Sequence, residues 1–181
     1  MAEYLDILDK SGTQTGESRT YEEAHQLGLI HKAVHVWIVN SENQILIQKR
    51  EKNRRAYPSH WDISSAGHVS AGETSREAGK REAKEELGIV LSDSDCIPLG
   101  TFEEHIILNE GTYINNEFQD VFIVRKDISI AEITIDPEEV EEVRWISIEE
   151  FQKWIDGKGE LMVPHTQEQK RLLEYLAINK A

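Results

Sequence analysis

The stretch GHVSAGETSREAGKREAKEELGI, residues 67–89, decides the fold of this 181-residue chain. Thr74 followed by Glu77 is a capping-box pattern, in which the two side chains satisfy free N–H groups at the start of a helix. Gly88 after Leu87 is a typical helix stop, because glycine readily adopts the left-handed conformation that ends many helices. The stretch therefore predicts a helix from about Ser75 to Leu87.

The predicted helix carries a narrow stripe of small residues. Gly79, Ala83 and Leu87 follow one another at intervals of four residues, so they share one face. A glycine inside a helix costs about 1 kcal/mol relative to alanine, and close packing against a sheet would explain its presence. Glu86 lies at the border of this stripe, where an unpaired carboxylate would be unfavourable.

Acidic residues gather on the same helix. With about 3.6 residues per turn, Glu82, Glu85 and Glu86 come together on one arc, and Arg81 alone cannot neutralise them. A hard divalent cation can, because Mg²⁺ prefers carboxylate oxygens and keeps water and phosphate oxygens as its other ligands. Such a metal also lowers the pKa of a bound water, which suits the attack of water on phosphorus. The alternative interpretation is a solvated charged helix in a chain with 30% charged residues.

This stretch resembles the Nudix box at every fixed position. The matching residues are Gly67, Glu73, Arg81, Glu82, Ala83, Glu85, Glu86, Leu87, Gly88 and Ile89. The resemblance implies an α+β fold, the Nudix-type α/β/α sandwich around a mixed β-sheet. It also implies hydrolysis of diphosphate linkages, usually in nucleotide-like compounds, with Mg²⁺ or Mn²⁺.

The resemblance also assigns roles to residues. It implies metal ligands at Glu82, Glu85 and Glu86 and at the carbonyl of Gly67, with Arg81 orienting the glutamates. Glu82, Glu85 and Arg81 are therefore the expected catalytic residues.

Outside the box, several acidic residues remain to be placed. Glu117 is our candidate for an additional metal ligand, since its side chain faces away from those of Phe118 and Phe122 along a predicted strand. An outward-facing strand carboxylate is the alternative. Glu103 and Glu104 are weaker candidates, and the acidic run at 138–142 is predicted to be a solvated loop.

Charge indicates the kind of substrate. A net charge of −14 argues against binding polymeric nucleic acid, whose phosphates require a basic surface. The segment QKREKNRR, residues 48–55, is nevertheless basic and precedes the acidic box. It is either an ordinary hairpin end or a local grip for a small phosphorylated substrate. The expected substrate-binding residues are Arg50, Arg54, Arg55, Trp61 and His68. For Trp61 the alternative is an anchor in the core.

A second resemblance, to type 1 isopentenyl diphosphate isomerase, extends over residues 30–69. That enzyme, itself of Nudix fold, binds a metal through three histidines and two glutamates and uses a cysteine in its acid–base pair. Its histidine positions fall at or near His25, His31 and His68, and one glutamate falls on Glu117. The other glutamate position holds Asn115, and the cysteine position holds Ala66, which cannot transfer a proton. We therefore expect hydrolase rather than isomerase activity, with a non-catalytic ligand sensor as a further alternative.

The remaining sequence predicts one domain over residues 1–181, with a short N-terminal strand and helix and a C-terminal helix. The strands are expected at 4–8, 31–40, 44–49, 61–65, 99–108, 113–125 and 143–146, and the other helices at 20–29, 147–155 and 166–176. Residues 10–17 are predicted to form a turn. The acidic N-terminus has no apolar signal segment, no run approaches the length of a membrane span, and the single cysteine, Cys96, excludes an intrachain disulfide. These features favour a cytoplasmic monomer or homodimer without membrane contact, with Cys96 in a surface turn.

Overall fold

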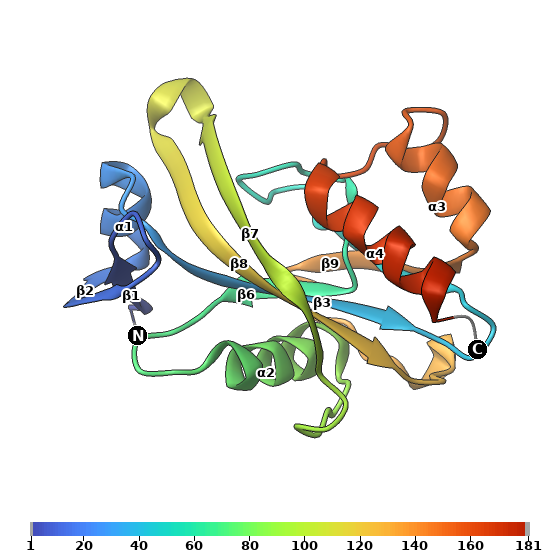
Figure 1. The fold of residues 1–181 in the computed structure, drawn as a ribbon. Coiled ribbons are helices and arrows are strands. Elements are labelled where there is room, and N and C mark those ends of the chain that lie inside the picture. Colours follow the sequence, from blue (N-terminus) through green and yellow to red (C-terminus); the bar gives the residue numbers. More distant parts are fainter. Residues whose placement is uncertain (1, 180–181) are drawn as a thin grey trace.

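A computed structural model describes residues 2–179, and a mixed sheet lies at their centre (Figure 1). The sheet has seven strands: the path β5-β4-β3-β8-β7, with β6 also pairing with β3 and β9 with β4. The strands are β3 His31–Val39, β4 Ile45–Arg50, β5 Trp61–Asp62, β6 Ser65–His68, β7 Ile97–Leu108, β8 Tyr113–Arg125 and β9 Val140–Ile146. β3 and β8 run parallel, with His31 opposite Glu117, and the other recorded pairings in this sheet are antiparallel.

Helices cover both faces of this sheet. Figure 1 shows α2 on one face and α3 and α4 on the other, which confirms the expected α/β/α sandwich around a mixed sheet. The helices are α1 Tyr21–Leu27, α2 Ser75–Leu87, α3 Ile148–Ile155 and α4 Thr166–Ile178, with short 3₁₀ turns η1 Asn109–Gly111 and η2 Ile130–Glu132. Within residues 2–179, none of the helices is long and apolar enough to cross a membrane.

The alternation of side chains along β3 divides the apolar interior into two layers. Val34, Val36 and Ile38 pack with the small face of α2, whereas Trp37 and Val39 pack with residues of α3 and α4. Because both faces of β3 are covered, its sequence is nearly continuously apolar, as expected for a central strand. β3 is thus buried on both faces, and β6 and β8, which carry polar groups, pair with it on either side.

The helix α2 has the bounds and caps that the sequence predicts. Thr74 and Glu77 form the reciprocal capping box, and Gly88 ends the helix with a φ of 70°. Gly79 lies against the sheet so closely that an added Cβ would be 3.1 Å from Cγ2 of Val36 and 3.2 Å from Cγ2 of Val34. The predicted close approach of helix and sheet is therefore confirmed.

Substituting Gly79 with Leu should destabilise the protein, because the new side chain would have to displace Val34, Val36 or the helix itself. Overpacking of this kind costs roughly 1–3 kcal/mol. We expect a lower midpoint of thermal unfolding, measured by circular dichroism. Lys84→Leu, on the exposed side of the same helix, is the matched control. Equal midpoints for the two variants would contradict the close packing.

Three sequence-based expectations need correction. The predicted turn at 10–17 is partly a strand: β2, Gln14–Thr20, pairs with β1, Tyr4–Leu8, in a separate two-stranded sheet. Residues 14–18 of β2 are exposed, so no alternation of apolar residues marks the strand. The predicted strand at 61–65 is divided between β5 and β6. Cys96 is buried rather than in a surface turn, and burial raises the pKa of its thiol.

Candidate active site

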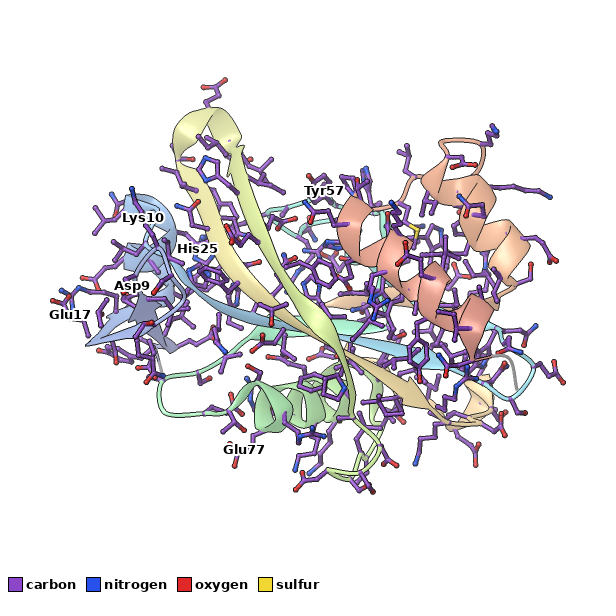
Figure 2. All side chains as sticks on the ribbon, in the orientation of Figure 1. Asp9, Lys10, Glu17, His25, Tyr57 and Glu77 are labelled. Atoms are coloured by element: carbon purple, nitrogen blue, oxygen red, sulfur yellow. The ribbon has the colours of Figure 1, made fainter. Side chains whose placement is uncertain are left out.

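A cleft of about 580 Å³ opens where β3, β6 and β8 meet the loop that follows β4. Helix α1 and the β7–β8 hairpin also contribute to its walls. In the view of Figure 2, His25 of α1 and Tyr57 of the loop lie on opposite sides of this hairpin. Charged and polar lining residues include His35, Arg50, Arg54, Arg55, Tyr57, Asp62, His68, Glu82, Glu104, Tyr113, Asn115, Glu117, Gln119, Glu139 and His165.

Two glutamates of α2 are buried beside this cleft. Glu82 is 9% exposed and Glu86 is 4% exposed. Burial, together with the nearby Glu86, raises the pKa of Glu82 to about 8. Burial, with a contribution from Glu139, likewise raises the pKa of Glu86 to about 7. Two adjacent carboxylates that resist ionisation would both be stabilised as anions by a cation between them.

The surroundings of these glutamates suit a hard divalent cation. Oε2 of Glu86 accepts hydrogen bonds from the backbone N–H of Ala66 at 3.1 Å and from Nε2 of Gln48 at 3.3 Å, which fixes the carboxylate. Gly67 lies directly against Glu82, since an added Cβ would be 2.1 Å from Oε1 of that residue. The donor set therefore consists of carboxylate oxygens next to a glycine backbone, and it fits Mg²⁺ or Mn²⁺.

Arg81 holds the acidic residues in place with a fully engaged guanidinium group. Its Nε and Nη2 contact the two oxygens of Glu73 at 3.0 and 2.9 Å, and Nη2 also donates to the carbonyl of His68 at 3.0 Å. Its Nη1 contacts Oε1 of Glu82 at 2.6 Å and Oε2 of Glu85 at 3.1 Å. The guanidinium fork thus links the helix to β6 and orients Glu82.

Glu85 differs from the other two glutamates of the predicted arc. Its side chain is 59% exposed, whereas Glu82 and Glu86, one helical turn apart, are buried. Two of the three glutamates are thus buried beside the cleft, while Glu85 is linked to Glu82 through Arg81. A role for Glu85 in metal binding or catalysis stays a prediction.

A second cluster, formed by His25, His31, His68 and Glu117, lies in the same cleft region. One possible ligand atom from each of these residues lies within 4.8 Å of all the others. Oε1 of Glu117 is 3.6 Å from Nε2 of His31 and 3.4 Å from Nε2 of His68. Burial alone would raise the pKa of Glu117, but its contacts with His31 and His68 hold it well below its usual range.

Backbone contacts orient two of these histidines. Nδ1 of His25 lies 2.8 Å from the carbonyl of Tyr21, and Nδ1 of His31 lies 2.9 Å from that of Leu29, so each Nδ1 carries the proton. Nε2 of each is then unprotonated when the ring is neutral, and in His25 it lies 3.1 Å from Oδ1 of Asn115. Burial lowers the pKa of His25 to about 4. Nε2 of His31 is buried without a hydrogen-bond partner in residues 2–179. Imidazoles held this way are suited to a metal that accepts nitrogen ligands.

The other predicted site residues can now be located in the structure. Arg50, Arg54, Arg55 and His68 line the cleft, as expected for substrate contacts. Glu117 is 7% exposed and faces the cluster, so the alternative of an outward-facing strand carboxylate is wrong.

Trp61 needs correction as a substrate-binding residue. It is 1% exposed in the apolar layer beneath α3, and its indole N–H donates to Glu160 at 2.7 Å. Arg144 covers its ring, with Cζ 4.6 Å from the ring centroid. The side chain therefore anchors the core instead of stacking on a ligand.

Sequence reasoning missed several residues that line the cleft. The sequence predicts a solvated loop for Glu139, but this residue lines the cleft and pairs with Arg54 at 3.1 Å. The acidic run was visible in the sequence, yet nothing local indicated which of its members would face inward. Asp62 and His165, which lie 103 residues apart and share a 2.9 Å hydrogen bond, carried no local signal.

Comparison with known proteins places this geometry in a family. Residues 29–165 match the model of the NUDIX domain. Nudix hydrolase 3 of Arabidopsis thaliana is 40% identical over 90% of this chain, which spans only 22% of that protein's length. An uncharacterized Nudix hydrolase of Listeria monocytogenes, lmo0368, is 35% identical over 83% of each chain. The crystal structure of DR0079 from Deinococcus radiodurans superposes with a TM-score of 0.73 over 93% of this chain and 98% of that one; at 24% identity, the likeness concerns the fold.

The similarity to isomerases is also found across the whole chain. The isopentenyl-diphosphate Delta-isomerase of Salmonella agona is 27% identical over 96% of this chain and 97% of its own. The identity to the Nudix hydrolases, 40% and 35%, is higher than the 27% identity to this isomerase. This order agrees with the acidic helix α2, which keeps all its glutamates. The chain belongs to the Nudix family.

Proposed function

We propose that this protein hydrolyses a diphosphate bond in a small phosphorylated compound, with Mg²⁺ or Mn²⁺ as cofactor. The observation that supports this most directly is the buried pair Glu82 and Glu86 beside a cleft bordered by Arg50, Arg54 and Arg55. The net charge of −14 favours a small anion over a nucleic-acid polymer, since these arginines form a local basic patch on an acidic protein.

In this proposal some residues bind the phosphates or the cation, and Arg81 orients a cation ligand. Arg54 and Arg55 neutralise the phosphates from the loop, and Arg50, fixed by its 2.8 Å contact with Asp62, does so from the end of β4. Glu82, Glu86 and the Gly67 carbonyl would hold the divalent cation, which supplies a bound water of lowered pKa and neutralises the diphosphate. Arg81 keeps Glu82 in position while the substrate is bound.

Arg54 is poised to change partners when a substrate arrives. Its contact with Glu139 is between half-exposed side chains, with 35% and 38% of their surfaces accessible. An exposed ion pair of this kind contributes at most about 1 kcal/mol, so a phosphate could replace the carboxylate at little cost. Release of Glu139 would then leave a further free carboxylate at the cleft wall.

Isomerase activity is the second candidate, because His25, His31, His68 and Glu117 do form a cluster. Against it, Ala66 offers no group that could move a proton to or from carbon. Oδ1 of the Asn115 amide lies 3.1 Å from Nε2 of His25, and this position has no carboxylate to offer.

A substrate screen decides between these functions. The purified protein should be incubated with nucleoside diphosphates, nucleotide sugars, ADP-ribose, dinucleotide polyphosphates, coenzyme A and isopentenyl diphosphate, each with Mg²⁺ or Mn²⁺. Cleavage to phosphorylated products supports the hydrolase, and formation of the allylic isomer supports the isomerase. Saturable binding without turnover of any compound would support a sensor and reject both enzymes.

The histidine cluster leads to a separate expectation about metal content. We expect one Zn²⁺ per chain to bind at His25, His31, His68 and Glu117, because neutral imidazoles and a carboxylate are good ligands for this ion. His31→Ala should remove it, as measured by mass spectrometry of metal content after dialysis. His105→Ala, which changes an exposed histidine, should retain it. Equal zinc content in both variants would reject the cluster as the site.

A further inference from the structure

His165 lines the same cleft as the histidine cluster and has no role in the function proposed above. It belongs to the short segment between α3 and α4, and its side chain is only 8% exposed. Its ring lies 4.9 Å from that of His35, which pairs with Glu168 of α4 at 2.7 Å. The surrounding charged groups come from five elements: His35 of β3, Arg50 of β4, Asp62 of β5, Glu104 of β7 and Glu168 of α4.

The backbone around His165 is fixed on both sides. On one side, the segment pairs with Trp61 of β5. The Trp61 N–H donates to the carbonyl of Leu161 at 2.9 Å, and the Val163 N–H donates to the carbonyl of Trp61 at 2.9 Å. On the other side, the amide N–H of Gln169 donates to the carbonyl of His165 at 2.8 Å. The imidazole is therefore held in place by the sheet and by α4, and does not hang from a free loop.

One ring nitrogen of His165 is fully engaged. Nε2 lies 2.9 Å from Oδ1 of Asp62, whose other oxygen accepts from Arg50 at 2.8 Å. The backbone N–H of Ile63 donates to the same Oδ1 at 2.8 Å. Burial opposes ionisation of Asp62, but these donors hold its pKa well below the usual range. Asp62 is thus an anion, and Nε2 of His165 must be the donor to it.

The other ring nitrogen has no partner. Nδ1 of His165 is buried and makes no hydrogen bond within residues 2–179. Oε1 of Glu104 is 3.9 Å away, too far for a direct hydrogen bond. Burial would lower the pKa of His165, but the hydrogen bond to Asp62 and the charges of Asp62, Glu168 and Glu104 raise it to about 9. The ring is therefore charged at neutral pH, and Nδ1–H is an unused donor.

Glu104 is held so that it faces this donor with one oxygen. Its Oε2 accepts from Nδ2 of Asn115 at 3.2 Å and from Nε2 of Gln119 at 3.0 Å. Oε1 remains on the side of His165. A donor and an acceptor separated by 3.9 Å can be bridged by one oxygen atom at roughly 2.8 Å from each.

A hydroxyl group fits this gap better than other common ligand groups. It accepts a hydrogen bond from Nδ1–H of His165 and donates its own proton to Glu104. A phosphate oxygen would satisfy His165 but would face the Glu104 carboxylate with like charge, and an apolar group would leave both unpaired. From this geometry we infer that His165 and Glu104 together bind a sugar hydroxyl of the substrate.

The inference rests on the proposed function in that the same cleft takes the diphosphate. It narrows the substrate class to diphosphate compounds that carry a free hydroxyl on the attached group, such as ribonucleoside diphosphates. A site built to bind a hydroxyl discriminates against the compound lacking it, since its buried polar groups are then left unpaired. Hydrogen bonds to charged groups correspond to about a 10- to 100-fold difference in affinity.

The test compares ADP, CDP, GDP and UDP with their 2′,3′-dideoxy counterparts. Binding is measured by calorimetry in Ca²⁺, with ³¹P NMR to confirm that the nucleotides stay intact, and turnover in Mg²⁺ is measured separately. We expect at least one ribonucleotide to bind wild-type protein about 10- to 100-fold more tightly than its dideoxy form. His165→Ala and Glu104→Ala should reduce this ratio to near one, whereas His165→Gln, which keeps a donor, should retain part of it.

His105→Ala is the matched control, because it lies next to Glu104 on β7 but is exposed, and it should keep the full ratio. Circular dichroism checks that each variant folds; if His165→Ala does not, Glu104→Ala and the wild-type ratio decide. Equal binding of both nucleotide forms, no binding of either, or an unchanged ratio in the folded variants would each overturn the inference. Selective binding of a ribonucleotide, together with no turnover of any compound in the substrate screen, would reject the hydrolase and leave this hydroxyl site standing.

Discussion

Replacing Glu86 with Gln is expected to lower Mg²⁺-dependent turnover by about three orders of magnitude or more. The amide keeps the shape of the side chain but removes the charge that would hold the cation, and a metal contributes several kcal/mol to charge stabilisation in such reactions. Ala66 N–H can still donate to the amide oxygen, so the helix should stay in place. The measurement is kcat on the best substrate from the screen, over a range of Mg²⁺ concentrations.

Glu77→Gln is the matched control for this substitution. Glu77 lies on the same helix, points away from the sheet in Figure 2, and serves only in the capping box, where Gln also functions. Its turnover should stay close to that of the wild type. A Glu86→Gln protein with unchanged turnover, in the presence of a normal circular dichroism spectrum, would reject the assignment of the metal site.

The metal-free protein should lose stability as the pH rises from about 5 to 8, and Mg²⁺ should restore it. The pKa values of Glu86 and Glu82 rise from 4.5 to about 7 and about 8 on folding. The folded state therefore binds more protons than the unfolded state between these values, so this contribution to stability is complete below about pH 4.5 and is lost as the pH rises through the folded pKa values. We expect the unfolding midpoint in EDTA to fall by about 5 °C or more.

Other groups titrate in the same range, and the Glu86→Gln variant separates them. The pKa of His165 rises from 6.5 to about 9 on folding, so its contribution to stability is complete below about pH 6.5 and is lost as the pH approaches 9. Glu86→Gln retains that contribution but lacks the one from Glu86, so its unfolding midpoint in EDTA should fall less steeply. Mg²⁺ should stabilise the wild type at pH 8 and have little effect on the variant. Parallel pH profiles for both proteins would show that Glu86 is not the group responsible.

The sequence predicts most of the framework because its signals are local. The helix from Ser75 to Leu87 is bounded by a capping box and a glycine, which act within a few residues, so its ends could be placed correctly. The same helical period grouped Glu85 with Glu82 and Glu86, but only the packing of α2 on the sheet shows that Glu85 is exposed. Trp61 illustrates the same limit, since an aromatic ring suits a core and a binding pocket equally well.

The two walls of the cleft depend on contacts between distant segments. His31 and Glu117 are neighbours only because β3 and β8 pair in parallel, and His165 meets Asp62 across 103 residues. The resemblance to isomerases indicated the first group by position. No spacing rule could indicate the second, because it is assembled by the backbone pairing of Leu161 and Val163, before α4, with Trp61 of β5.

The parallel pairing of β3 with β8 also limits where this chain can change in length. Inserting one residue between Asn115 and Glu117 while the rest of β8 keeps its pairing would turn the preceding side chains to the opposite face, so Asn115 would leave the cleft. The tip at Asn109–Gly111 has no such constraint, since its residues are exposed. Divergence among related chains should therefore be tolerated at the outer end of the hairpin, which can alter what surrounds a bound molecule without disturbing the groups beneath it.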